Sequence, residues 1–132
     1  MKFKYKRYGQ GILRPVIPVE VRFGKQSVRY EVMVDSGADG SFFDWGIAET
    51  LGIDVEAGER VSVQGITGEP GDCFRHSVTL VVGGHEIAVP VGFMQLPEDG
   101  IGAVGQEGFF ERFIVKFDYQ KREIELKPTT NL

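Results

Sequence analysis

Apolar and polar side chains alternate along much of this chain, which is the pattern of β-strands that bury one face. Glycine is abundant, with 18 residues, and Val, Ile, Phe and Thr are plentiful, which favours strands joined by tight turns. Gly24-Lys25-Gln26 is the predicted turn between two of them. The pattern predicts strands over residues 2–8, 16–23, 27–34, 60–66, 73–82 and 85–93, and a last hairpin of residues 113–119 and 122–127 around Gln120-Lys121.

The spacing of apolar residues changes from a strand pattern to a helix pattern after residue 43, where a short helix is predicted. Asp44 can cap its first turn, Ile47, Ala48 and Leu51 share one side, and Gly52 ends it. A second short helix is predicted at residues 107–112. Together the elements predict a mainly β domain, either a small barrel or a sandwich-like sheet.

Length and composition narrow the class of protein. No linker or repeat divides the 132 residues, so we expect one domain spanning residues 1–132. The net charge of −4 argues against a nucleic-acid-binding protein. The single Cys73 cannot form an internal disulfide, and we expect a reducing, cytoplasmic location. The segment MKFKYKRYGQ has no apolar core of a signal peptide, and no apolar run approaches the roughly 18 residues that span a bilayer, so no membrane association is expected.

The segment Gly100-Ile101-Gly102-Ala103-Val104-Gly105 has the spacing of a dinucleotide-binding fingerprint, GxGxxG. That function requires a buried strand before the motif and a long helix with another parallel strand after it. Here Pro97-Glu98-Asp99 precedes the motif as a turn, and residues 106–132 have room for only a short helix and a hairpin. The motif therefore indicates a glycine-rich strand that another backbone approaches closely.

Asp35-Ser36-Gly37 directly follows the predicted strand 27–34 and is the strongest candidate for chemistry. A carboxylate beside a buried strand is costly unless it is paired or functional. Taken alone, however, this tripeptide most often forms only a turn, because Asp and Ser bond their own backbone and Gly accepts positive φ. The surrounding pattern has to decide between the two interpretations.

That surrounding pattern resembles the retropepsin-like aspartic peptidases, the family of retroviral proteases and related single-domain cellular and bacterial proteins. Four segments match in the family's order over roughly residues 12–127: Arg14-Pro15 at the first strand, VDSGAD (residues 34–39) as the catalytic loop, VQGITGEPG (63–71) as the flap hairpin, and Ala103-Val104-Gly105 behind the active site. The resemblance implies a small closed β-barrel of the retropepsin type with one or two short helices.

The resemblance also implies an aspartic endopeptidase that needs no metal or other cofactor and acts on a peptide or protein substrate. In such enzymes two carboxylates share one proton, so that one activates water and the other protonates the carbonyl oxygen. This chain has one Asp-Ser-Gly only. The resemblance therefore implies a homodimer in which Asp35 meets Asp35 of the partner subunit at the two-fold axis.

Carried over position by position, the resemblance assigns the remaining site residues. Ser36 would tie the two catalytic loops together, Gly37 would let the substrate backbone approach, and Asp39 would pair with Arg14 of the other subunit. Residues expected to contact the substrate are Gly37, Ala38, Asp39, Ala103, Val104 and the flap residues Gly65, Ile66, Thr67 and Gly68.

Two departures from the retroviral pattern leave alternatives open. Gln106 stands where those enzymes carry an arginine that supports the catalytic loop, and a full hairpin follows their usual C-terminus. A retropepsin-like module that binds peptide or dimerises without catalysis is one alternative. An unrelated β-barrel binding domain whose Asp-Ser-Gly is only a turn is another.

Other reactive residue types favour no competing chemistry. His76 and His85 are far apart and lack metal-ligand spacing, so surface or strand histidines are expected. Ser36 has no histidine signature nearby, which argues against a Ser-His-Asp hydrolase.

Overall fold

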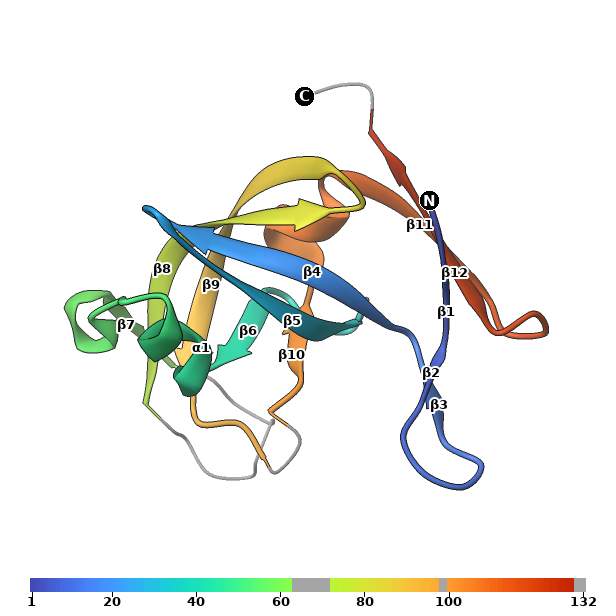
Figure 1. Cartoon of the computed structure of the whole chain (residues 1–132), viewed down its shortest axis with the longest axis horizontal. Coiled ribbons are helices and arrows are strands. Elements are labelled where there is room, and N and C mark those ends of the chain that lie inside the picture. The colour runs from blue at the N-terminus through green and yellow to red at the C-terminus, as the bar shows by residue number, and fades with distance from the viewer. Residues whose placement is uncertain (63–71, 98–99, 130–132) are drawn as a thin grey trace.

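The computed structural model describes residues 1–62, 72–97 and 100–129 and is dominated by strands (Figure 1). Its strands are β1 (Lys2–Lys4), β2 (Lys6–Arg7), β3 (Leu13–Arg14), β4 (Val16–Phe23), β5 (Gln26–Val34), β6 (Ser41–Asp44), β7 (Glu59–Val61), β8 (Cys73–Val82), β9 (His85–Met94), β10 (Gly102–Val104), β11 (Phe113–Asp118) and β12 (Glu123–Pro128). The helical turns are α1 (Trp45–Thr50), η1 (Val55–Ala57) and η2 (Gln106–Phe110).

The larger sheet closes on itself as a barrel. Its strand order is β4-β5-β10-β6-β9-β8-β7. An additional antiparallel pairing of β4 with β8 closes the six strands from β4 to β8 into a barrel, and β7 extends the sheet beyond β8. Inward-facing residues of these strands form one core that includes Val21, Phe43, Leu80, Val89 and Phe93, each fully buried. The predicted mainly β class is confirmed, and of the two architectures left open the barrel is the one observed.

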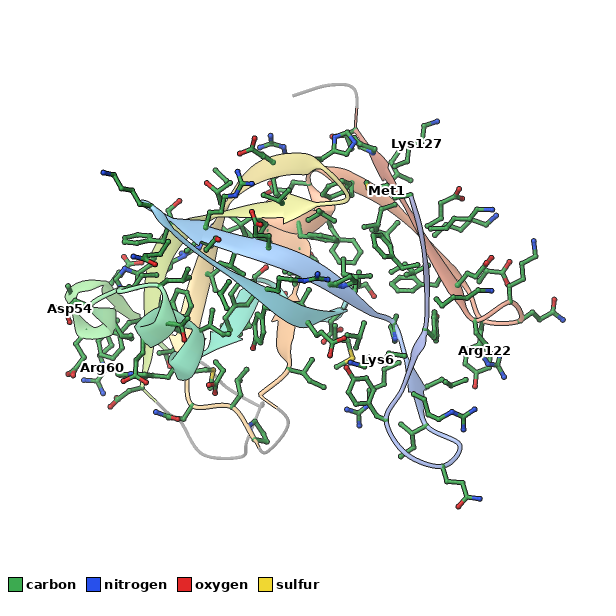
Figure 2. The ribbon with its side chains drawn as sticks, viewed as in Figure 1. Met1, Lys6, Asp54, Arg60, Arg122 and Lys127 are labelled. Carbon is green, nitrogen blue, oxygen red and sulfur yellow. The ribbon has the colours of Figure 1, made fainter. Side chains whose placement is uncertain are left out.

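A separate three-stranded sheet brings the two ends of the described chain together. Its order is β1-β12-β11, and Figure 2 shows Met1 lying beside the β11–β12 hairpin, whose turn carries Arg122. Ile124 and Leu126 on β12 are fully buried and belong to the same core as the barrel residues. The small sheet is thus anchored to the barrel by apolar packing.

Most predicted elements are observed close to their predicted bounds. Asp44 caps α1, accepting a hydrogen bond from the Gly46 N–H at 2.9 Å, and Gly52 follows the helix with a φ of +74°. The turn between β4 and β5 is Gly24-Lys25, with Gln26 already in β5. Among the described residues, no helix is long and apolar enough to cross a membrane.

Two predicted elements were wrong in detail. Residues 2–8 form two short strands, because the Tyr5 N–H bonds the carbonyl of Arg122, where the partner strand has ended in a turn, and β2 then pairs with β3 instead. Residues 107–112 form no regular helix: η2 is a distorted turn in which Glu107 is extended and Gly108 has a φ of +88°. Of the predicted strand 60–66, only the part through residue 62 lies in the described chain, and β7 ends at Val61.

Candidate active site

Asp35 lies immediately after β5, at the point where the strand leaves the barrel wall. Val32 and Val34 are buried, whereas Asp35 is only partly buried. Its backbone N–H donates to the carbonyl of Val104 at 3.0 Å, and its side-chain Oδ1 accepts from the Gly37 N–H at 2.9 Å. The carboxylate is therefore held in a fixed direction by a local turn while the backbone remains tied to β10.

The loop formed by residues 35–40, called the Asp35 loop below, rests on the backbone that follows β10. The N–H of Gln106 donates to the carbonyl of Ala38 at 2.9 Å, and the N–H of Glu107 donates to that of Asp39, also at 2.9 Å. β10 itself runs parallel to β5, with Val104 opposite Val34. The end of β10 and the residues that follow it thus support the loop through backbone hydrogen bonds to Asp35, Ala38 and Asp39.

Position 105 has to be glycine, because there is no space for a side chain where the backbone after β10 passes the Asp35 loop. A Cβ on Gly105 would lie 2.2 Å from the carbonyl oxygen of Gly40 and 2.5 Å from that of Ala38. The Gly105 N–H donates to the Oγ of Ser41 at 3.2 Å, and Ser41 is only 3% exposed. The glycine-rich strand with a closely approaching backbone, predicted from the GxGxxG segment, is confirmed.

Gln106 contacts the Asp35 loop through its side chain as well. Its Nε2 donates to the carbonyl oxygen of Ser36 at 3.0 Å. From the sequence, we noted only that Gln106 replaces the arginine of the retroviral enzymes, without predicting a contact for its side chain. The amide contact had no local signal, because the two residues are 70 positions apart.

A cavity of about 190 Å³ opens beside the Asp35 loop, between Asp39 and the first residues of β6. Arg75 and Glu107 form an ion pair in its wall. Sequence reasoning placed Asp39 near the substrate but missed the other residues that line this cavity: Gly40, Ser41, Phe42, Val61, Ser62, Arg75, Pro90, Gly92 and Glu107. Except for Gly40, Ser41 and Phe42, which directly follow Asp39, they come from elements distant in sequence, so no local pattern could have found them.

The other predicted site residues lie in several elements. Ala103 and Val104 are in β10, where Ala103 pairs with Met33 on one side and Phe42 on the other. Arg14 is in β3, with its guanidinium 5.3 Å from the centre of the Tyr8 ring. The flap residues Gly65, Ile66, Thr67 and Gly68 lie outside the described residues.

Several other polar residues have structural roles. A His76 ring nitrogen lies 2.8 Å from the carbonyl oxygen of Val55, within hydrogen-bond distance. The hydroxyl of Tyr30 accepts from the Asp44 N–H at 3.1 Å and donates to the carbonyl of Gly100, and burial raises its pKa above the ordinary range. Cys73 is fully buried, and burial raises its thiol pKa to about 11.

A closed β-barrel in which a parallel pair of strands carries an Asp-Ser-Gly loop has the architecture of the retropepsin-like aspartic peptidases. A family model described as aspartyl protease matches residues 17–107, and the chain belongs to this aspartyl protease family.

Solved structures of two such proteins are similar to the chain. A retropepsin-like aspartic protease from Rickettsia conorii has a TM-score of 0.64 at 19% identity, with 94% of this chain and 97% of that chain covered. The EIAV protease in complex with the inhibitor HBY-793 has a TM-score of 0.52 at 22% identity, with 76% and 88% covered. At these identities the likeness shows the fold. A search among curated proteins gave no match.

Proposed function

We propose that the protein is an aspartic endopeptidase in which Asp35 supplies one half of a catalytic dyad and Asp35 of a second subunit supplies the other. The observation that carries the proposal is the setting of this carboxylate. It is held by the Gly37 N–H at 2.9 Å at the end of β5 and backed by β10, in a chain of the aspartyl protease family. Because the chain contains one Asp-Ser-Gly, the second carboxylate has to come from another copy.

The chemistry follows from two like charges held close together. Such a pair keeps one proton, because both carboxylates cannot ionise at short distance. The ionised Asp35 of one subunit takes a proton from water, whose oxygen attacks the peptide carbonyl. The protonated Asp35 of the other subunit gives its proton to the carbonyl oxygen. Collapse of the tetrahedral intermediate then breaks the C–N bond, with a proton passing to the leaving nitrogen.

The substrate is proposed to bind extended along the Asp35 loop. Gly37 leaves room for its backbone, and Ala38, Ala103 and Val104 lie beside or behind that path. The cavity next to Asp39 is large enough to take one substrate side chain. The residues Gly65, Ile66, Thr67 and Gly68 are proposed to cover the peptide as a flap.

The dimer is proposed to be held together at the same loop. Ser36 would bond across the two-fold axis, and Arg14 of one subunit would pair with Asp39 of the other. The single domain of residues 1–132 would thus supply half of the one shared site.

The decisive experiment compares Asp35→Asn with the matched control Asp54→Asn. Asp54 is exposed beside η1, at the side of the barrel away from the small sheet (Figure 2), and its side chain makes no capping bond. We expect cleavage of a peptide library by the parent and by Asp54→Asn from acid to neutral pH, and none by Asp35→Asn. Cleavage that survives in Asp35→Asn would refute the mechanism.

The alternative is a catalytically silent member of the family that binds peptide or dimerises. The absence of the retroviral arginine at position 106 is the feature that favours it. A parent protein that is dimeric by analytical ultracentrifugation and binds extended peptides, yet cleaves none of the library, would establish this alternative in place of the enzyme.

A further inference from the structure

Gln106 holds the Asp35 loop at two points. Its side-chain Nε2 donates to the carbonyl oxygen of Ser36 at 3.0 Å, and its backbone N–H donates to that of Ala38 at 2.9 Å. The two bonded carbonyls lie on either side of Gly37. A glycine has wide backbone freedom, so the direction of the peptide groups around it has to be fixed by their hydrogen-bond partners.

The peptide group between Ser36 and Gly37 links Gln106 to the catalytic carboxylate. This group is planar, so the Ser36 oxygen and the Gly37 N–H turn together as one unit. The oxygen accepts from Gln106, and the N–H donates to Oδ1 of Asp35 at 2.9 Å. Hydrogen bonds in series also polarise one another, so donation from Gln106 makes the Gly37 N–H a stronger donor.

We propose that Gln106 is a positioning residue: its side-chain amide orients the Ser36–Gly37 peptide group and thereby aims and strengthens the hydrogen bond on Asp35. The consequence for catalysis rests on the aspartic peptidase function proposed above. The effect on the loop itself does not, because it follows from the two hydrogen bonds alone.

Three substitutions separate hydrogen-bond donation from packing. Gln106→Met keeps the length of the side chain without a donor, Gln106→Glu replaces the donor with an acceptor, and Gln106→Arg restores an N–H donor. We expect kcat to decrease about five-fold in Gln106→Met, corresponding to one lost neutral hydrogen bond, and further in Gln106→Glu when the glutamate is ionised. Gln106→Arg recovers kcat, and KM changes little throughout, because the bond acts on Asp35.

The matched control is Gln120→Met in the exposed turn between β11 and β12. It is expected to leave kcat and KM unchanged. A purely structural role of Gln106 would instead give equal values for Met, Glu and Arg, or a uniform loss that follows the stability of the fold.

A second measurement does not depend on activity. Ser36-Gly37 is the one Ser-Gly pair in the sequence, so protein labelled with carbonyl-¹³C serine and ¹⁵N glycine gives a single selective amide signal from Gly37. We expect this signal to move upfield and its amide exchange to accelerate in Gln106→Met and Gln106→Glu, and to return in Gln106→Arg.

The outcomes distinguish the two proposals. An unchanged Gly37 signal in Gln106→Met and Gln106→Glu overturns the positioning role, whatever the activity. A changed Gly37 signal in these variants, together with a parent protein that cleaves no peptide, supports the loop contact and refutes the enzyme. A changed signal with unaltered kcat overturns the catalytic consequence of the contact.

Discussion

Replacing Gly105 with alanine tests whether the Asp35 loop depends on close backbone contact. The new Cβ would lie 2.2 Å from the Gly40 oxygen and 2.5 Å from the Ala38 oxygen. Both distances fall about 1 Å short of ordinary van der Waals separation. The obstructing atoms are backbone, so no side-chain rotation relieves the overlap, and the two segments have to move apart.

That separation would weaken the hydrogen bonds that join the segments. The bonds at risk are Gln106 N–H to Ala38 O at 2.9 Å and Gly105 N–H to Ser41 Oγ at 3.2 Å. Overpacking typically costs about 1–3 kcal/mol, and each lost hydrogen bond adds about 1 kcal/mol. We expect Gly105→Ala to lower the free energy of unfolding by about 3 kcal/mol, equivalent to a Tm decrease of about 10 °C for a domain of this size.

Gly24→Ala is the control, because a side chain at position 24 would strain the backbone without meeting any neighbouring atom. Gly24 has a φ of +58°, which strains any L-residue, but a Cβ at this position would meet nothing within 4 Å, whereas Gly105 has a φ of −122° and no such strain. Strain alone costs about 1 kcal/mol. Urea unfolding of both variants measures the difference, and a Gly105→Ala cost no larger than that of Gly24→Ala would refute the reasoning.

Two further predictions concern groups buried around the same site. Ser41→Ala leaves the Gly105 N–H without its acceptor, so we expect urea unfolding to show a loss of about 1–2 kcal/mol in the free energy of unfolding. The control Ser77→Ala removes an exposed hydroxyl and should cost almost nothing. Equal effects of the two substitutions would contradict the role given to the Ser41 hydroxyl. Because burial raises the thiol pKa of Cys73 to about 11 from 9.0, the folded state keeps this proton at a pH where the unfolded state has lost it. Stability should therefore fall as the pH rises from about 9 to 11, and this slope should be shallower in Cys73→Ala; the same slope in both proteins would show that the thiol does not contribute.

Much of the barrel could be predicted because its signals are local. Alternation along β4 and β5 and the Asp44 cap of α1 each involve neighbouring residues. The break at Tyr5 could not be predicted, since it depends on where β12 begins at the other end of the sequence. The distorted turn η2 was missed because Gly108 adopts a positive φ inside the segment that was expected to be helical.

The candidate site was predictable only through its motifs. Asp35 and the support behind it came from the resemblance of ordered segments. The cavity beside Asp39 and the contact between Gln106 and Ser36 came only from the structure, because each joins residues that are far apart along the chain. The Arg75–Glu107 ion pair, for example, spans 32 positions and has no local signature.

The support of the Asp35 loop by β10 has a consequence for the order of folding events. The loop lies in the first third of the sequence, yet its hydrogen-bond partners, Val104 to Glu107, come about 70 positions later. Closing so long a segment is a slow, entropically costly step compared with forming the β4–β5 hairpin. A chain that has not yet incorporated β10 therefore lacks the backbone hydrogen bonds that hold the Asp35 loop in place, and the site is completed only when the barrel closes.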